Sequence, residues 1–163
     1  MENKEVNTIA KAGQYLTFVL NSQSYGVPIG TVREINRVGE ITAVPKVPHY
    51  VSGVMNLRGK VIPVVNLRTR LAFEPIDYTK ETCIIVIETT SGQVGMIVDA
   101  VKGVMDLTSA NIEPPPFLNN SNYNDYVMGM GKLDDQIIIL IDIVRTIIED
   151  YSAVKPAEEK LAA

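Results

Sequence analysis

Few residues in this chain of 163 could carry catalysis, because it has one histidine and one cysteine. A histidine acting as a general base needs a nucleophile and an orienting group nearby, and a catalytic cysteine needs a base that activates its thiol. His49 stands in a proline-rich connection, and Cys83 opens an apolar run as a small core residue would. This pattern predicts no catalytic residues, and one histidine with one cysteine cannot build a structural zinc site.

Ligand-binding motifs are also missing from the sequence. It contains neither the glycine-rich P-loop nor the GxGxxG pattern of dinucleotide-binding proteins. Asp134, Asp135 and Asp142 could suggest a cation site, but a charged hairpin turn followed by a helix N-cap at Asp142 explains them better. We therefore expect neither a metal nor a cofactor.

The most unusual charged residue is Arg58, inside the stretch GVMNLRGKVIPVVNLR at residues 53–68. This stretch predicts two apolar strands joined by a polar corner, since β-branched residues favour strands and Gly59 allows the positive φ of a tight turn. Arg58 would stand at the tip, where a solvated turn residue is the plain alternative. Glu34 could pair with it from a neighbouring strand, in a bidentate arrangement.

The elements that must hold these residues are strands. The chain is 46% hydrophobic, has no Trp and three Phe, and is rich in Val and Ile, which predicts an aliphatic β core. Apolar spacing at i, i+4 and i+8 predicts one short amphipathic helix over residues 143–151. The strands are expected at residues 14–20, 25–29, 31–37, 54–57, 61–67, 83–88, 94–100, 101–107, 127–133 and 136–141.

The pattern of strands runs twice along the chain. An alignment that places Gly26 on Gly95 matches the first strands of the two copies, and one that places Gly53 on Gly129 matches their hairpins. Each copy has about five strands in roughly 65 residues, a size at which a lone domain is marginal. Two small, partly closed barrels that share apolar surface are therefore expected, at residues 14–72 and 80–142.

The two copies differ at the charged residues. In these alignments Glu34 falls on Gly103 and Arg58 falls on Asp134, so the charged pair exists only in the first copy. A structural ion pair is one interpretation, and a partner-binding pair is the other. Apolar residues at the junction of the barrels could form a groove for an amphipathic helix or could hold the barrels together: Ile29, Val32, Val98 and Val101.

Bulk properties exclude several classes of protein. The net charge is −4 and the pI is about 5.0, which argues against nucleic-acid binding. No apolar run is long enough to insert into a membrane, and the polar lead-in at residues 1–13 lacks the apolar core of a signal peptide. Together with the single cysteine, this predicts a cytoplasmic protein with flexible ends at 1–13 and 152–163.

Four stretches together resemble the CheW family of bacterial chemotaxis coupling proteins. They are GVMNLRGKVIPVVNLR at 53–68, FVLNSQSYGVPIGTVREI at 18–35, GMIVDAVKGVMDL at 95–107 and MGMGKLDDQIIILIDI at 128–143. The resemblance covers residues 14–151 and implies a single CheW-like domain. It also implies an all-β fold with a short C-terminal helix, in which two similar five-stranded SH3-like barrels pack around a shared apolar core.

The resemblance further implies a non-catalytic adaptor. One face would bind the regulatory domain of the histidine kinase CheA, and another the cytoplasmic tip of chemoreceptors, the methyl-accepting chemotaxis proteins. Such an adaptor would be recruited to membrane-associated receptor arrays and could assemble in rings. The receptor side would comprise Ile29, Val32, Glu34, Arg58 and Val98, with Arg58 supported by Asn56, Leu57 and Gly59; no motif selects kinase-binding residues.

Two alternatives remain open from the residues. One is a small-ligand-binding double barrel with its cleft between the copies, and the other is an adaptor for a kinase pathway outside chemotaxis. A rise in melting temperature with a metabolite library would favour the first.

Overall fold

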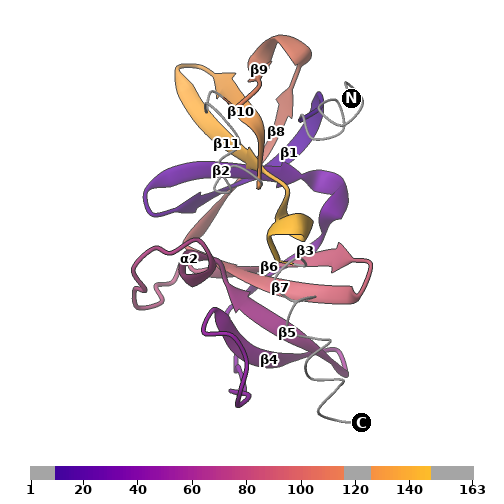
Figure 1. Cartoon of the computed structure of the whole chain (residues 1–163), viewed down its shortest axis with the longest axis vertical. Coiled ribbons are helices and arrows are strands. Elements are labelled where there is room, and N and C mark those ends of the chain that lie inside the picture. Colours follow the sequence, from indigo (N-terminus) through magenta and orange to yellow (C-terminus); the bar gives the residue numbers. More distant parts are fainter. Residues whose placement is uncertain (1–9, 116–125, 148–163) are drawn as a thin grey trace.

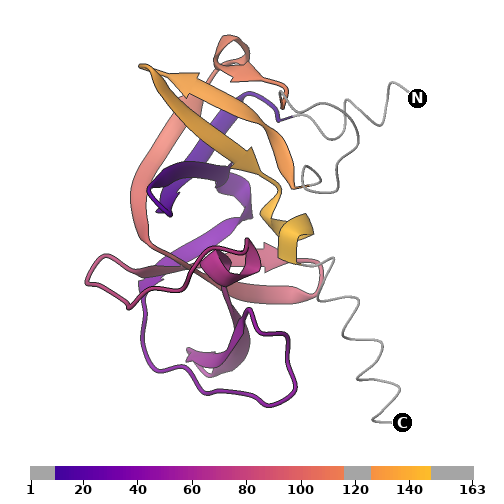
Figure 2. The ribbon, with the colours of Figure 1, turned by 60° about the vertical axis from the view of Figure 1, so that its left-hand side comes forward.

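The computed structural model describes residues 10–115 and 126–147, which form two β-sheets with short helices between them (Figure 1 and Figure 2). Most of the expected flexible ends and residues 148–151 of the expected C-terminal helix lie outside these residues. Residues 143–147 are helical, and the Asp142 carboxylate accepts a hydrogen bond from the Arg145 N–H at 3.0 Å, which confirms the N-cap.

Sheet A contains six strands. In spatial order they are β8 (Ala100–Leu107), β1 (Gly13–Leu20), β2 (Gln23–Pro28), β11 (Gln136–Ile141), β10 (Val127–Leu133) and β9 (Ile112–Glu113). Sheet B contains β3 (Val32–Arg37), β6 (Cys83–Thr89), β7 (Gly92–Val98), β5 (Lys60–Asn66) and β4 (Val51–Leu57). The remaining helical elements are η1 (Ile29–Thr31), α2 (Leu67–Arg70) and η2 (Ser109–Asn111). The all-β prediction is confirmed, and the short β9 gives sheet A a sixth strand, one more than the five expected in each barrel.

The strand order supports the internal duplication. The alignments of Gly26 with Gly95 and of Gly53 with Gly129 place β8-β1-β2-β11-β10 of sheet A on β3-β6-β7-β5-β4 of sheet B, strand for strand. The parallel pairing of Leu140 with Gly26 in sheet A corresponds to that of Val64 with Gly95 in sheet B. Two matched sheets of this kind are what two copies of one unit should form.

The sheets do not coincide with the division expected at residues 14–72 and 80–142. The β1–β2 hairpin of the first half joins the strands of the second half in sheet A, and the β6–β7 hairpin of the second half joins sheet B. The parallel pairs β2–β11 and β5–β7 and the antiparallel pairs β1–β8 and β3–β6 make this exchange, so each copy completes the sheet of the other. Neither half of the sequence contains a whole sheet.

The exchanged hairpins are buried on both faces. In β6 the four residues from Ile84 to Ile87 are fully buried, because alternate side chains point into different cores. Ile85 and Ile87 join the core between the sheets, whereas Ile84 and Val86 join the core inside the curl of sheet B. This explains the continuous apolar sequence of the strand, and the core between the sheets confirms the expected shared core.

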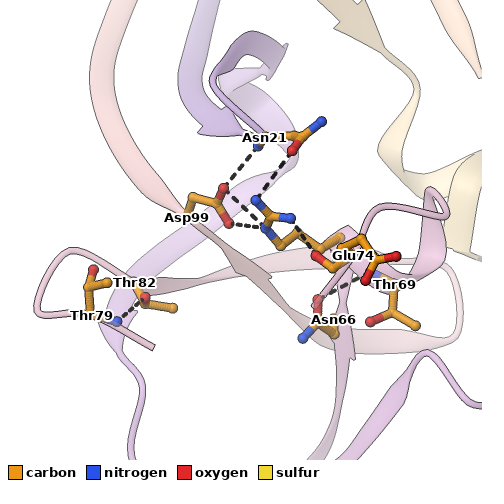
Figure 3. Close-up of polar contacts among 8 residues, drawn as sticks. Asn21, Asn66, Thr69, Glu74, Thr79, Thr82 and Asp99 are labelled. Carbon is orange, nitrogen blue, oxygen red and sulfur yellow. Dashed lines mark hydrogen bonds and ion pairs between the residues drawn. The ribbon is translucent and has the colours of Figure 1, made fainter. Parts of the chain in front are cut away.

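A polar contact also joins the sheets, at α2. The Arg68 guanidinium donates to Asp99, with 3.0 Å between Nε and Oδ1, to Asn21 Oδ1 and to the Glu74 carbonyl, as drawn in Figure 3. Asn21 belongs to the β1–β2 turn of sheet A, and its N–H donates to the same Asp99 carboxylate at 2.9 Å. Arg68 is 9% exposed, so this ion pair is largely shielded from water.

Arg70, the next arginine of α2, contacts a different set of residues. The Arg70 guanidinium lies 5.3 Å from the ring of Tyr50 and 4.9 Å from that of Tyr126, and it donates to the Thr146 carbonyl at 3.1 Å. One short helix therefore ties sheet B to the β1–β2 turn and to the helical residues 143–147, which lie between the sheets in Figure 2.

Candidate functional site

The polar corner predicted at residues 53–68 is a two-residue hairpin turn between β4 and β5. Arg58 has φ 50° and Gly59 has φ 88°, and positive φ at both positions matches a type I′ turn. The Asn56 side-chain carbonyl accepts a hydrogen bond from the Gly59 N–H at 2.8 Å, and Leu57 is 8% exposed in the core of sheet B. These contacts fix the turn and present Arg58 to solvent.

Arg58 forms an ion pair with Glu34 at this corner. Arg58 Nη2 lies 2.5 Å from Glu34 Oε2, and the exposed fractions of the two side chains are 72% and 22%. The hydrogen bond from Arg58 lowers the pKa of Glu34 below its usual range, and Glu34 in turn raises the pKa of Arg58. The result is an ion pair at the surface of sheet B, in which Arg58 is mostly exposed and Glu34 is mostly covered.

The expectation that Glu34 and Arg58 come from neighbouring strands is wrong. Glu34 lies on β3 and Arg58 follows β4, and these strands are the opposite edges of sheet B. Because strong twist curls the sheet, the β4–β5 turn reaches the far edge, and the ion pair spans the two edges. Strand spacing in the sequence could not show this, since the pairing order is set by hairpins far along the chain.

The second copy has the same turn without the pair. Asp134 has φ 50° and Asp135 has φ 66°, so the β10–β11 hairpin repeats the backbone of the β4–β5 turn. Gly103 occupies the position equivalent to Glu34 and has no side chain to offer. The turn is therefore a property of the fold, and the charged pair is a property of the first copy alone.

The predicted apolar members of the site lie deeper than expected. Val98 is 1% exposed and belongs to the core between the sheets, whereas Ile29 and Val32 are half-buried and pack against that core. Val98 as a surface contact is thus a wrong expectation, because the β6–β7 hairpin that carries it is covered on both faces. Ile29 and Val32 do reach the surface, on η1 and at the start of β3.

Two basic residues near the corner were missed by sequence reasoning. Arg33 lies beside Glu34 on β3 and pairs with Glu88 on β6, with 3.4 Å between Nε and Oε1. Lys60 opens β5 immediately after Gly59 and is exposed. The sequence could have indicated them, because Arg33 is next to Glu34 and Lys60 is next to Gly59. The corner is therefore more basic than Arg58 alone indicates.

The catalytic candidates lie apart from this corner. His49 makes an edge contact with the ring of Tyr50, and Cys83 is half-buried with its thiol 3.2 Å from the Glu81 carbonyl. In the part of the chain that the structure describes, no three His, Cys, Asp or Glu side chains are grouped as metal ligands would be. Within the same residues, no helix has the length and apolar character needed to cross a bilayer.

Comparison with known proteins agrees with the fold and with the sequence motifs. The model of the CheW-like domain matches residues 14–150, a range that includes the β4–β5 corner and nearly all of both sheets. The chemotaxis protein CheW of Thermotoga maritima is 35% identical over 141 residues, which cover 85% of this chain and 90% of the relative. That of Klebsiella aerogenes is 32% identical over 140 residues, covering 86% and 84%.

A solved structure is also similar. The crystal structure of the scaffolding protein TtCheW from Thermoanaerobacter tengcongensis matches with a TM-score of 0.75 and 34% identity, over 83% of this chain and 92% of that one. Sequence and fold therefore agree over most of the chain. This chain belongs to the CheW-like family of chemotaxis proteins.

Proposed function

We propose that this protein is a non-catalytic chemotaxis adaptor that couples chemoreceptors to the histidine kinase CheA. The observation that carries the proposal is the Glu34–Arg58 pair, which occupies one of two equivalent hairpin corners. A structural requirement of the fold would apply to both corners, and the second corner carries Asp134 instead. An ion pair present in one copy only is better explained by a partner that binds there.

The backbone at Arg58 supports the same conclusion. A non-glycine residue in the left-handed region costs roughly 1–2 kcal/mol, and Asn, Asp and Gly bear that cost better than Arg. Arg58 nevertheless stands at φ 50° with 72% of its side chain exposed. Strain at an exposed charged tip points to selection for binding, since the turn itself would be more stable with another residue.

The receptor-binding surface in this proposal comprises Ile29, Val32, Glu34 and Arg58. Ile29 and Val32 supply apolar contact where η1 meets β3. The Glu34–Arg58 pair at the adjacent corner orients the bound partner through charged hydrogen bonds. Val98 supports this surface from below as part of the core. The kinase CheA would bind elsewhere on the double sheet, and the protein would act in the cytoplasm at receptor arrays.

A pull-down with purified wild-type protein and the Arg58→Glu variant tests the proposal, with captured proteins identified by mass spectrometry. We expect the wild type to capture a CheA-type kinase and chemoreceptors, and the folded variant to keep the kinase while losing the receptors. Capture of neither partner by the wild type would refute the adaptor function. Unchanged receptor capture by the variant would refute the assignment of Arg58.

A further inference from the structure

A cleft of about 480 Å³ opens in sheet B between the beginnings of β5 and β7. Residues from four strands line it, among them Arg33, Lys60, Val61, Pro63, Glu88 and Gln93. Figure 1 shows the β4–β5 hairpin diverging from the β6–β7 hairpin toward this end of the sheet. The cleft is therefore a gap between two parallel strands that pair only further along.

The pairing registers show why the gap exists in one sheet only. In sheet B the β5–β7 ladder begins with Val64 and Gly95. In sheet A the β11–β2 ladder begins two residues earlier, at Ile138 and Ser24, and includes Ile139 with Tyr25. Position 63, the equivalent of Ile139, is a proline, which has no backbone N–H to donate to a neighbouring strand.

The cleft presents a mixed apolar and charged surface, on which the two cations of Arg33 and Lys60 outnumber the one carboxylate of Glu88. Val61 is 70% exposed at its rim, which is a large apolar exposure for a strand residue. Lys60 is exposed, and its ammonium has no hydrogen-bond or ion-pair partner among the residues that the structure describes. Arg33 pairs with Glu88, but both side chains are about half exposed, and such a pair contributes little to stability. A carboxylate from outside could therefore replace Glu88 as the partner of Arg33 with little loss.

We propose that this cleft is a docking site for the chemoreceptor, for a segment that carries a carboxylate beside an aliphatic side chain. The carboxylate binds between Lys60 and Arg33, and the aliphatic side chain covers Val61 and Pro63. This inference rests on the proposed function and extends its surface, because Arg33 adjoins Glu34 and Lys60 follows the Arg58–Gly59 turn. The lining carries two cations and one carboxylate, a net positive charge on a chain of net charge −4, which makes an acidic partner segment the matching occupant.

The test uses the full chain and the purified cytoplasmic fragment of a chemoreceptor that the wild type captures. Titrations compare wild type with Lys60→Glu and Val61→Asp, and the second copy supplies matched controls in Gln136→Glu and Ile137→Asp. Ile137 is 52% exposed at the position equivalent to Val61, but the β11–β2 ladder begins at the next residue. We expect each cleft variant to raise the Kd about tenfold or more and each control to change it less than about twofold.

Further measurements separate the cleft from the corner. Circular dichroism and melting temperature establish that the variants are folded. When single carboxylates of the receptor fragment are replaced by lysine, one of these replacements should restore binding to the Lys60→Glu variant. If Arg58→Glu loses the receptor while both cleft variants keep the wild-type Kd, the cleft proposal is wrong and the proposed function stands. Equal losses of receptor affinity in the cleft variants and in their controls would also overturn the cleft proposal. A wild type that binds no receptor fragment would overturn both proposals.

Discussion

Glu34 and Arg58 lie at opposite edges of the same five-stranded sheet, and 2.5 Å separates Glu34 Oε2 from Arg58 Nη2. The ion pair therefore brings together β3, which begins beside the core between the sheets, and the corner of the β4–β5 hairpin. A partner bound at this pair contacts two segments that no backbone hydrogen bond joins directly.

The charge of Arg58 should matter more than the shape of its turn. Arg58→Asn removes the charge and places at φ 50° a residue that tolerates this conformation, so we expect the free energy of unfolding to stay equal or rise by up to about 1 kcal/mol. Receptor binding should fall by about tenfold or more, measured by titration with the receptor fragment. Asp134→Asn, at the equivalent turn, is the control and should leave receptor binding unchanged.

Exchange of the two charges tests whether they act as a pair. Glu34→Lys alone places two cations at the corner and should weaken receptor binding, and Arg58→Glu added to it should recover part of the loss by restoring an ion pair of reversed order. A double-mutant cycle on the receptor Kd measures this coupling. Strictly additive losses would show that the residues contact the partner separately.

Acid should break the pair at Glu34. The hydrogen bond from Arg58 holds the pKa of Glu34 below its ordinary value of 4.5. The contribution of the pair to stability is therefore complete above about pH 4.5 and is lost as the pH falls through the lowered pKa. Carboxyl NMR titration should show a depressed pKa in the wild type and a higher one in Arg58→Asn. The same pKa in both proteins would contradict the pairing in solution.

Gly53, on β4 of the corner hairpin, should tolerate substitution less well than Gly103. It has φ 146°, and an added Cβ would lie 2.1 Å from the Thr42 carbonyl oxygen, which pairs with Val54. Gly103 has φ 149° with open space around it, so it carries the same backbone strain without the clash. We expect Gly53→Ala to lower the free energy of unfolding by at least about 3 kcal/mol and Gly103→Ala by about 1–2 kcal/mol, in urea titrations.

The Arg68–Asp99 pair should contribute to stability where an exposed pair does not. Arg68→Gln leaves the largely buried Asp99 carboxylate without its cation, and we expect a loss of about 3 kcal/mol in the free energy of unfolding. Arg33→Gln breaks the exposed pair with Glu88 and should cost less than about 1 kcal/mol. Equal costs in denaturant titrations would mean that Arg68 does not hold the sheets together.

Local sequence determined the elements and the corner. The β-branched runs specify strands, the Arg58–Gly59 and Asp134–Asp135 dipeptides specify tight turns, and Asp142 caps a helix, all through contacts within a few residues. The repeated order of these elements, with Gly26 matching Gly95 and Gly53 matching Gly129, likewise predicted two equivalent units. Each of these features depends on backbone preferences that neighbouring residues decide.

The tertiary structure alone decided which strands share a sheet and which side chains meet. The exchange of the β1–β2 and β6–β7 hairpins, the burial of Val98, and the contact of Glu34 with Arg58 across opposite edges all depend on strand pairings, parallel and antiparallel, between distant segments. The same is true of the cleft at Pro63, where a missing N–H matters only because β7 lies beside it. Such relationships arise from packing two units against each other, and no local spacing in the sequence encodes them.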